Sequence, residues 1–128
     1  MTASRFPCLG SVVWVELADA RGALKVRPAV VISPTAQITT GATIRVVAVT
    51  SRLPDVLPQD HVLLPWHPQG KARSGLRRRC AAVVTWQAVV PVEKVQEVVG
   101  ILPNDVIAEL LAKVKAILNG PTDEDDTI

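Results

Sequence analysis

The segment 25–34, KVRPAVVISP, constrains the fold of this chain more than any other stretch. It joins two cations, Lys25 and Arg27, to a proline and then to an unbroken run of branched apolar residues. Because the run does not alternate with polar residues and is bounded by prolines, it predicts a strand buried on both faces. An arginine that precedes such a strand lies at the rim of a rigid sheet, where its planar guanidinium can face a phosphate. Taken alone, a solvated charge at a strand start is the simpler interpretation of Arg27.

The composition favours one domain rich in strands. A chain of 128 residues is long enough for one core and too short for two domains. Hydrophobic residues make up 48% of it and aromatic residues only 3%, so the core must consist mainly of Val, Leu, Ile and Ala. No apolar run approaches the roughly 20 residues that span a bilayer, and the N-terminus has no signal-peptide core. We therefore expect a cytoplasmic protein with no membrane segment and with Cys8 and Cys80 reduced.

Further strands are expected on both sides of this segment. Apolar runs separated by polar, glycine- or proline-containing stretches predict strands at 11–17, 25–34, 43–50, 61–64 and 80–87, with a continuation at 89–92. The first two strands should form an antiparallel hairpin. Residues 93–100 fit either a helical turn or a strand. Long loops are expected at 18–24, 52–60 and 65–79.

One amphipathic helix is predicted at the end of the chain. Apolar residues recur at three- and four-residue spacing from Ile107 to Leu118, which gives a single apolar stripe. Pro103 suits the first turn, and Asn119-Gly120-Pro121 is expected to end the helix. A helix that follows five or six short strands can pack across a curled sheet. The pattern predicts an α+β domain, a small antiparallel barrel with long loops on one rim.

The charge of the chain is distributed unevenly. The formal net charge is +2, yet residues 121–128 carry acids at positions 123–126 and no base. We expect this stretch to be a disordered acidic tail behind one folded domain, 1–120. The window 71–79, KARSGLRRR, contains five bases and no acid. A stripe of this kind indicates a polyanionic partner, with a solvated loop as the alternative.

The order of these segments resembles a known family. GSVVWVEL, KVRPAVVISP, IRVVAVTS, SGL…CAAVV and VEKV…VVGIL, followed by a closing helix, are similar to the MazF/PemK toxins over residues 9–118. The resemblance implies an SH3-like barrel of about six or seven strands, usually a homodimer. It also implies the toxin of a type II toxin–antitoxin system, a sequence-preferring endoribonuclease on single-stranded RNA that a cognate antitoxin neutralises. Cleavage in the family needs neither metal nor cofactor: the 2′-hydroxyl attacks the adjacent phosphate and leaves a cyclic phosphate.

The resemblance also implies the residues of the site. The arginine before the proline and the hydroxyl residues that end the third strand are the expected catalytic residues, namely Arg27, Thr50 and Ser51. Attack on a phosphodiester builds negative charge on the phosphorane oxygens, which a fixed guanidinium stabilises. For RNA binding we expect phosphate contacts from Lys25, Arg52, Lys71, Arg73, Arg77 and Arg78. Trp14 could stack on a base, and its alternative role is packing in the core.

Two departures from the family leave alternatives open. Some PemK-type members carry an arginine and an aspartate where this chain reads VVTW at 83–86, and the loop 18–24 lacks a glutamate often found before the arginine. One alternative is therefore a gyrase-poison-like toxin that inhibits a protein partner. The other is an RNA-binding barrel that has lost cleavage. The histidines and cysteines show no metal-ligand spacing, so no metal site is predicted. His67 is the side chain near the basic window that titrates around neutral pH.

Overall fold

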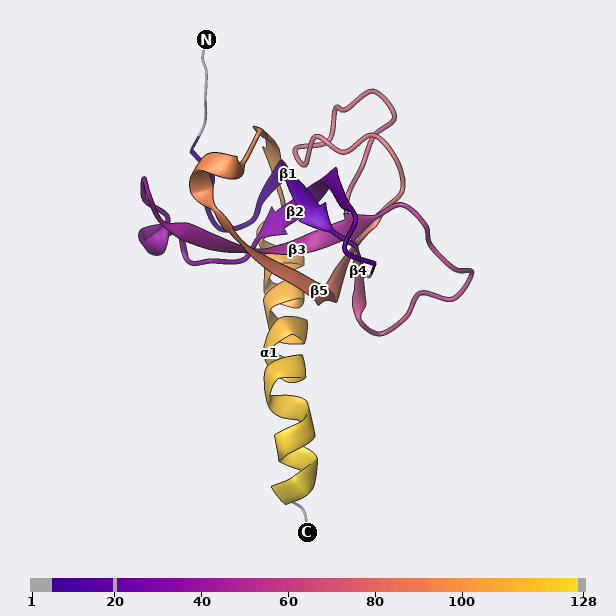
Figure 1. Cartoon of the computed structure of the whole chain (residues 1–128). Coiled ribbons are helices and arrows are strands. Elements are labelled where there is room, and N and C mark those ends of the chain that lie inside the picture. The colour runs from indigo at the N-terminus through magenta and orange to yellow at the C-terminus, as the bar shows by residue number, and fades with distance from the viewer. Residues whose placement is uncertain (1–5, 20, 127–128) are drawn as a thin grey trace.

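Strands come first and a helix comes last, as the sequence predicts (Figure 1). This computed structural model describes residues 6–19 and 21–126, with side chains described as far as residue 117. The strands are β1 (Ser11–Ala18), β2 (Leu24–Val31), β3 (Thr43–Thr50), β4 (His61–Leu63), β5 (Ala81–Pro91) and β6 (Glu97–Ile101). The helix α1 spans Asn104–Asp126.

The strands form one antiparallel sheet in the order β4-β5-β3-β2-β1-β6. β1 and β2 form the predicted hairpin, with Ala18 opposite Leu24, so their connection is shorter than the predicted loop. The sheet is open, with β4 and β6 as its edges, and the closed SH3-like barrel is therefore not confirmed. Because β4 has only three residues, it can form few backbone hydrogen bonds with a further strand. The two edges are connected by the loop that follows β4. This loop reaches β6, where the Ile101 N–H donates to the carbonyl of Arg73 at 2.9 Å.

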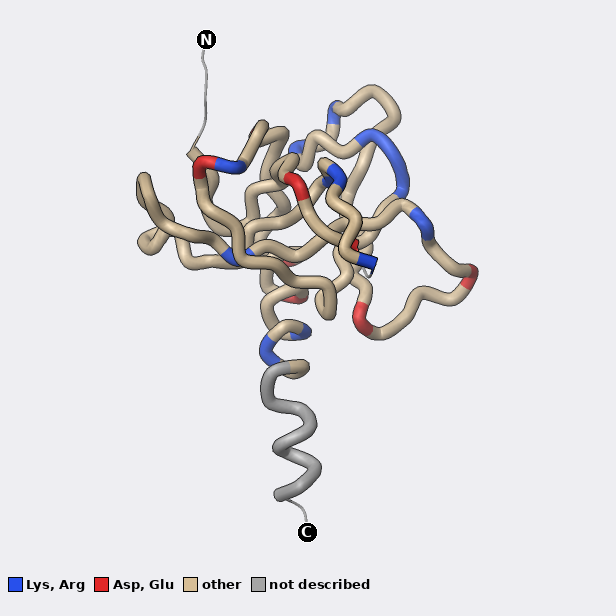
Figure 2. Tube along the Cα trace, in the orientation of Figure 1, with Lys and Arg blue, Asp and Glu red and all other residues tan. Residues whose placement is uncertain are grey.

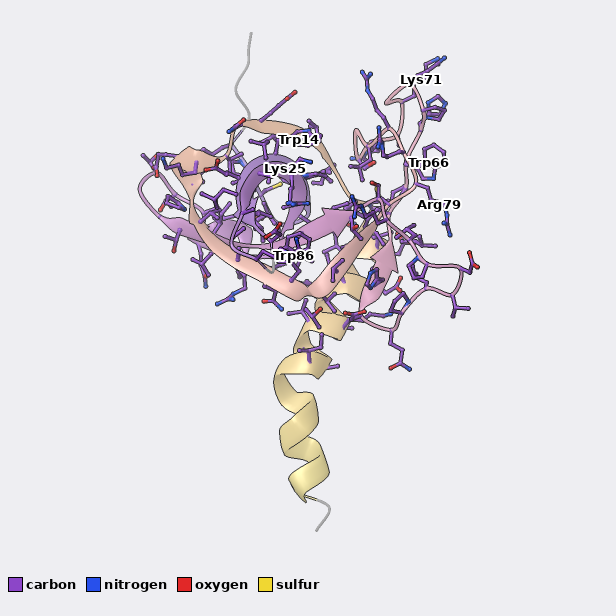
Figure 3. The ribbon with its side chains drawn as sticks, turned by 45° about the vertical axis from the view of Figure 1, so that its right-hand side comes forward. Trp14, Lys25, Trp66, Lys71, Arg79 and Trp86 are labelled. Atoms are coloured by element: carbon purple, nitrogen blue, oxygen red, sulfur yellow. The ribbon has the colours of Figure 1, made fainter. Side chains whose placement is uncertain are left out.

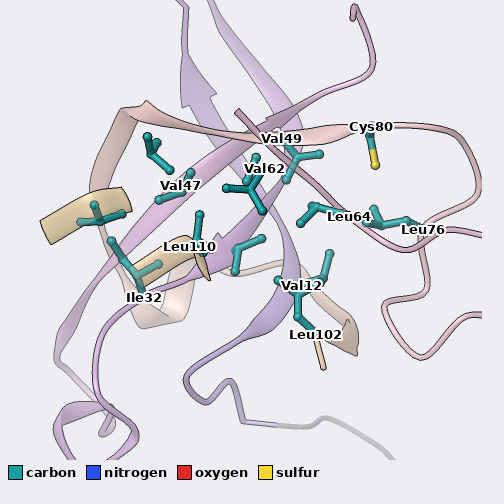
Figure 4. Packing of buried hydrophobic residues seen from close by; sticks show 14 residues of the cluster. Val12, Ile32, Val47, Val49, Val62, Leu64, Leu76, Cys80, Leu102 and Leu110 are labelled. Atoms are coloured by element: carbon teal, nitrogen blue, oxygen red, sulfur yellow. The ribbon is translucent and has the colours of Figure 1, made fainter. Parts of the chain in front are cut away.

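The apolar run of β2 is buried on both faces, as predicted. Val30 and Ile32 belong to a cluster between the sheet and α1, which we call the helix-side cluster (Figure 4). Ala29 and Val31 belong to a cluster on the other face, the far-side cluster. The helix-side cluster contains Val12, Val30, Ile32, Val47, Val49, Val62, Leu64, Leu76, Cys80, Ala82, Val84, Leu102, Leu110 and Val114. The far-side cluster contains Val13, Val15, Leu17, Ala29, Val31, Ile38, Ile44, Val46, Ala48 and Val92.

The structure also resolves the stretch for which the sequence left two alternatives. β5 runs to Pro91 as one strand, but it contains an irregularity opposite the middle of β3. Val47 pairs with Gln87 and Val49 with Ala82, so the extra residues of this register shift lie in β5. The chain then makes a 3₁₀ turn over Val92–Lys94 and enters β6. Residues 93–100 are thus partly a helical turn and partly a strand, and that strand pairs with β1.

The helix presents the predicted apolar stripe to the sheet and packs on β5 and β4. Leu110 and Val114 are buried in the helix-side cluster, and Ile107 packs against it. Among the described residues, no helix is both long and apolar enough to span a membrane.

The helix continues to Asp126, so the prediction that Asn119-Gly120-Pro121 ends it is wrong. Gly120 and Pro121 each disfavour the interior of a helix, so the helix continues here against a local preference. Figure 1 shows this last part of α1 running away from the sheet. The division into a folded domain, 1–120, and a disordered tail, 121–128, stays a prediction, and residues 127–128 lie outside the described residues.

The end of the second long loop is tied to β5 and to α1. The Thr85 hydroxyl donates to Oδ2 of Asp60 at 2.8 Å, and Nδ1 of His61 lies 2.8 Å from Oδ1. These two interactions, that of Thr85 first, hold the pKa of Asp60 below its ordinary value. From the helix, Nζ of Lys113 donates to the carbonyl of Gln59 at 2.8 Å. The loop is therefore anchored at its C-terminal end rather than free along its length.

Candidate active site

A groove of about 1250 Å³ opens beside the ends of β2 and β3. Strands β1, β5 and β6 and the long loop 65–79 complete its walls. Most of the predicted site residues line it: Trp14, Lys25, Arg27, Thr50, Ser51, Arg52, Arg77 and Arg78. Residues that are 64 positions apart in the chain, Trp14 and Arg78, therefore share one cavity.

Arg27 is held in this groove by an aromatic ring that the sequence analysis did not assign. The side chain of Arg27 is half-buried, and its guanidinium carbon lies 5.0 Å from the centroid of the Trp86 ring. Figure 3 labels Trp86 beside Trp14 and Lys25. Within the described part of the chain, the buried Nε of Arg27 has no hydrogen-bond partner. A guanidinium at this distance from an indole makes a cation–π interaction and stays free to donate elsewhere. Arg27 lines the groove, so the outer part of its guanidinium can face a ligand there, whereas Nε itself is enclosed by the protein.

Trp86 is fixed in turn by the hairpin that carries Arg27. Its Nε1–H donates to the carbonyl of Ala18 at 3.2 Å, across from β5 to the end of β1. The ring packs against the far-side cluster, the same face of the sheet to which Ala29 contributes. A sequence signal existed, because Trp86 interrupts an otherwise small apolar strand. Periodicity alone assigns such a residue to the core.

The register of the sheet brings Thr50 towards Arg27. β2 and β3 pair Ala29 with Ala48, and the ladder stops there because Pro28 has no N–H to donate. Two residues further along each strand, in the same register, are Arg27 and Thr50. Antiparallel partners share a face, so both side chains belong to the groove side of the sheet. The Arg52 N–H donates to Oγ1 of Thr50 at 3.1 Å, which leaves the hydroxyl proton able to point into the groove.

Asp19 is a groove residue that the sequence analysis missed. It follows β1, and its Oδ1 accepts hydrogen bonds from the N–H groups of Arg21 at 2.8 Å and Ala23 at 3.0 Å. These backbone donors, with a smaller contribution from the nearby charge of Arg27, hold the pKa of Asp19 below its ordinary value. An aspartate in the short turn of a hairpin is a signal for this local geometry, but not for its place beside Arg27. At neutral pH it is an anion and a weak general base.

The charge of the groove is predominantly positive. Its basic lining residues are Lys25, Arg27, Arg52, Arg77 and Arg78, and its acidic ones are Asp19 and Glu97. Figure 2 shows Lys and Arg gathered on the long loops at one side of the sheet. A concave basic surface attracts a polyanion over distances comparable to the Debye length.

The loop 65–79 forms one wall of the groove and has an ordered base. The buried Ser74 hydroxyl donates to the carbonyl of Pro65 at 2.7 Å and accepts from the Leu76 N–H at 3.2 Å. Gly75 has a φ of +75°, and a Cβ there would collide with the carbonyl of Val99 in β6. Because only glycine tolerates both conditions easily, this position fixes the loop against the sheet.

Two of the predicted RNA-binding residues are not in the groove lining. Lys71 lies toward the tip of the loop in Figure 3, and Arg73 lies where the loop meets β6. His67 also lies outside the groove, and its Nδ1 accepts the Gln69 N–H at 3.1 Å. Both cysteines are free, and burial raises the pKa of Cys80 to about 11. Within the described residues, no three side chains of His, Cys, Asp or Glu gather to hold a metal ion.

Comparisons with known proteins identify the family of the chain. Residues 9–118 match the family model of the PemK-like, MazF-like toxins of type II toxin–antitoxin systems. The chain has no significant match among the curated protein sequences.

Solved structures of this family are also similar to the chain. A crystal structure of MazF from Deinococcus radiodurans is 26% identical with a TM-score of 0.69, covering 91% of this chain and 99% of that one. A MazE–MazF structure from the same organism is 26% identical with a TM-score of 0.67, covering 90% and 98%. An endoribonuclease from a mycobacterial species shares the fold at 12% identity and a TM-score of 0.63, covering 91% and 94%. With its family match along most of its length, the chain belongs to the PemK-like, MazF-like toxins of type II toxin–antitoxin systems.

Proposed function

We propose that this chain is an endoribonuclease that cleaves single-stranded RNA in the groove around Arg27. The observation that carries the proposal is the convergence of Arg27 and Thr50 in the lining of one basic groove. Single-stranded RNA is the substrate class, because a groove of this kind holds a flexible phosphate backbone and leaves the bases accessible.

The residues suggest a division of labour during cleavage. The 2′-oxygen of the RNA attacks the adjacent phosphorus, the bond to the 5′-oxygen breaks, and the products are a 2′,3′-cyclic phosphate and a 5′-hydroxyl. Arg27 donates to the phosphorane oxygens as negative charge accumulates, which commonly contributes about 3–4 kcal/mol per donor. The Thr50 hydroxyl orients a non-bridging oxygen. Neither carboxylate of the groove is assigned as the base, and Asp19 is a poor candidate because its pKa is lowered.

Trp86 occupies the strand where some PemK-type members have an ionisable pair. Its indole supports the guanidinium of Arg27 instead of exchanging protons. In this chain the strand therefore contributes to catalysis by positioning a charge. Cleavage then depends mainly on electrostatic stabilisation, with proton transfer left to solvent or to the RNA itself.

The partners follow from the family and its solved structures. The MazE–MazF structures from Deinococcus radiodurans contain a toxin together with its antitoxin. By analogy, a cognate antitoxin binds this chain and neutralises it. A homodimer is the assembly expected from the family.

The decisive experiment uses the purified chain, labelled single-stranded RNA and EDTA. We expect discrete fragments whose ends resist phosphatase until acid opens the cyclic phosphate. Arg27→Ala should reduce the rate about a hundredfold or more while the circular dichroism spectrum is retained. Arg45→Ala is the matched control, because Arg45 is an exposed arginine of β3 outside the groove lining. Its rate should stay within about twofold of the wild type.

Other outcomes would favour the alternative functions. Equal cleavage by the Arg27→Ala variant would remove Arg27 from the mechanism. If the protein binds RNA but produces no fragments, the result would support an RNA-binding protein of this fold that has lost cleavage. No RNA binding, together with a growth defect that depends on DNA gyrase, would support a gyrase poison.

A further inference from the structure

Trp66 is the exposed tryptophan of this chain. It retains 42% of its surface in contact with solvent, whereas Trp14 and Trp86 are half-buried in the groove. It follows β4 at the start of the loop 65–79 and is not part of the groove lining. Figure 3 shows Trp66 on the same outer flank of the molecule as Arg79, away from the labelled groove residues. An indole in this position has no evident role in the apolar core.

Backbone hydrogen bonds place Trp66 opposite the arginine run. The Leu64 N–H donates to the carbonyl of Cys80 at 3.1 Å, and the His67 N–H donates to the carbonyl of Leu76 at 2.9 Å. These two bonds hold the segments 64–67 and 76–80 side by side and antiparallel. Trp66 therefore faces the chain segment 77–79, which is arginine at every position.

The same arginines connect Trp66 to the groove. Arg77 and Arg78 line the groove, and all three arginines of the run are exposed to solvent. These exposed arginines thus form a basic path from the groove to the chain segment that lies opposite Trp66. A phosphate backbone that follows this path carries its next bases past the indole.

The backbone next to Trp66 is anchored by an internal hydrogen bond, which favours a fixed stacking surface. Its preceding residue, Pro65, is held through its carbonyl by the buried Ser74 hydroxyl at 2.7 Å. A flat, preorganised indole among cations suits an unpaired nucleobase, and base stacking on an aromatic ring contributes about 1–3 kcal/mol.

We propose that Trp66 is a stacking subsite for an unpaired base of RNA that flanks the scissile phosphate. The inference rests on the proposed function, because it assigns a second contact to the same substrate. The ligand is the nucleobase itself, while the neighbouring arginines contact the phosphates. The subsite would extend the recognised RNA beyond the groove by a nucleotide or more.

The test measures binding without cleavage. The probe is a fluorescent oligonucleotide with 2′-O-methyl sugars throughout and all four bases, which lacks the attacking hydroxyl. A second probe of equal length and charge is abasic at every position. Affinities are measured by fluorescence anisotropy for the wild type and for Trp66→Ala, Trp66→Leu and Trp66→Phe. Val56→Ala, in another exposed loop, is the control variant.

A stacking role predicts a specific pattern of affinities. Trp66→Ala and Trp66→Leu should weaken binding of the base-containing probe about tenfold and leave the abasic probe unchanged. Trp66→Phe, which keeps a flat ring, should stay within about threefold of the wild type. Val56→Ala should match the wild type with both probes. Equal thermal midpoints for all variants would show that the fold is retained.

The failure of this inference can be separated from the failure of the nuclease proposal. If Trp66→Ala binds the base-containing probe as tightly as the wild type, the subsite is refuted even where RNA is still cut. Equal losses with both probes would also refute stacking, because the indole would then affect only the phosphate contacts. If the predicted pattern appears but no RNA is ever cleaved, the subsite stands and the nuclease proposal fails.

Discussion

Replacing Trp86 should slow RNA cleavage because this residue supports the guanidinium of Arg27 in the groove. The ring lies 5.0 Å from the guanidinium carbon of Arg27 and donates one hydrogen bond to Ala18. A cation–π interaction at a half-buried site contributes about 1 kcal/mol, and a neutral hydrogen bond contributes about another 1 kcal/mol. Trp86→Leu removes both interactions, so we expect kcat to fall about 10- to 30-fold. Trp86→Phe keeps an aromatic face and should lose about fivefold.

The assay should separate positioning from binding. The groove keeps all of its cations in both variants, so KM and the salt dependence of RNA binding should change by less than about twofold. A double-mutant cycle is the sharpest form of the test. If Trp86 acts through Arg27, Trp86→Leu should have little further effect in the Arg27→Ala background.

Two results would refute this reasoning. Wild-type cleavage by Trp86→Leu, with its fold retained by circular dichroism, would show that the stacked geometry contributes nothing. Additive losses in the double variant would show that Trp86 acts independently of Arg27, for example on the RNA directly.

Two further predictions concern stability. A Cβ on Gly100 would collide with the backbone of Arg73 and the residue after it, so Gly100→Ala should lower the free energy of unfolding in urea by about 3 kcal/mol. Gly22→Ala is the control, because its Cβ would meet no atom and only the φ of +85° disfavours it, at a cost of about 1–2 kcal/mol. If Gly100→Ala cost no more than Gly22→Ala, the predicted collision would be refuted. Because the pKa of Asp60 is lowered in the folded state, its contribution is present above the unfolded pKa and is lost as pH falls through the folded value. Thr85→Val removes the main hydrogen bond to this carboxylate, so acid unfolding followed by circular dichroism should begin at a higher pH, while an unchanged midpoint would contradict the assignment.

Most of the secondary structure could be predicted because it depends on local pattern. The buried part of β2 follows from an unbroken apolar run bounded by prolines, and the apolar stripe of α1 follows from a period of 3.6 residues. The hairpin follows from two such strands joined by a short polar segment. The predicted end of the helix is wrong. The prediction relied on the local stop signal Asn119-Gly120-Pro121, and α1 continues past it to Asp126. The barrel was expected from the pattern of strands and from the family resemblance. It is not confirmed, because the sheet is open and its edge strand β4 has only three residues.

Some features of the candidate site could also be predicted from the sequence, and others depend on the tertiary structure. The sequence by itself determined that Arg27 precedes the buried part of a strand, that Thr50 ends another strand, and that a basic loop follows β4. Only the tertiary structure placed Trp86 under Arg27 and Asp19 beside it. The reason is physical: periodicity reports which face of its own strand a residue occupies, whereas strand order and register decide which distant residues share that face. Trp86 and Arg27 meet because the curled sheet turns β5 and the β1–β2 hairpin toward one groove, and no local pattern encodes that curvature.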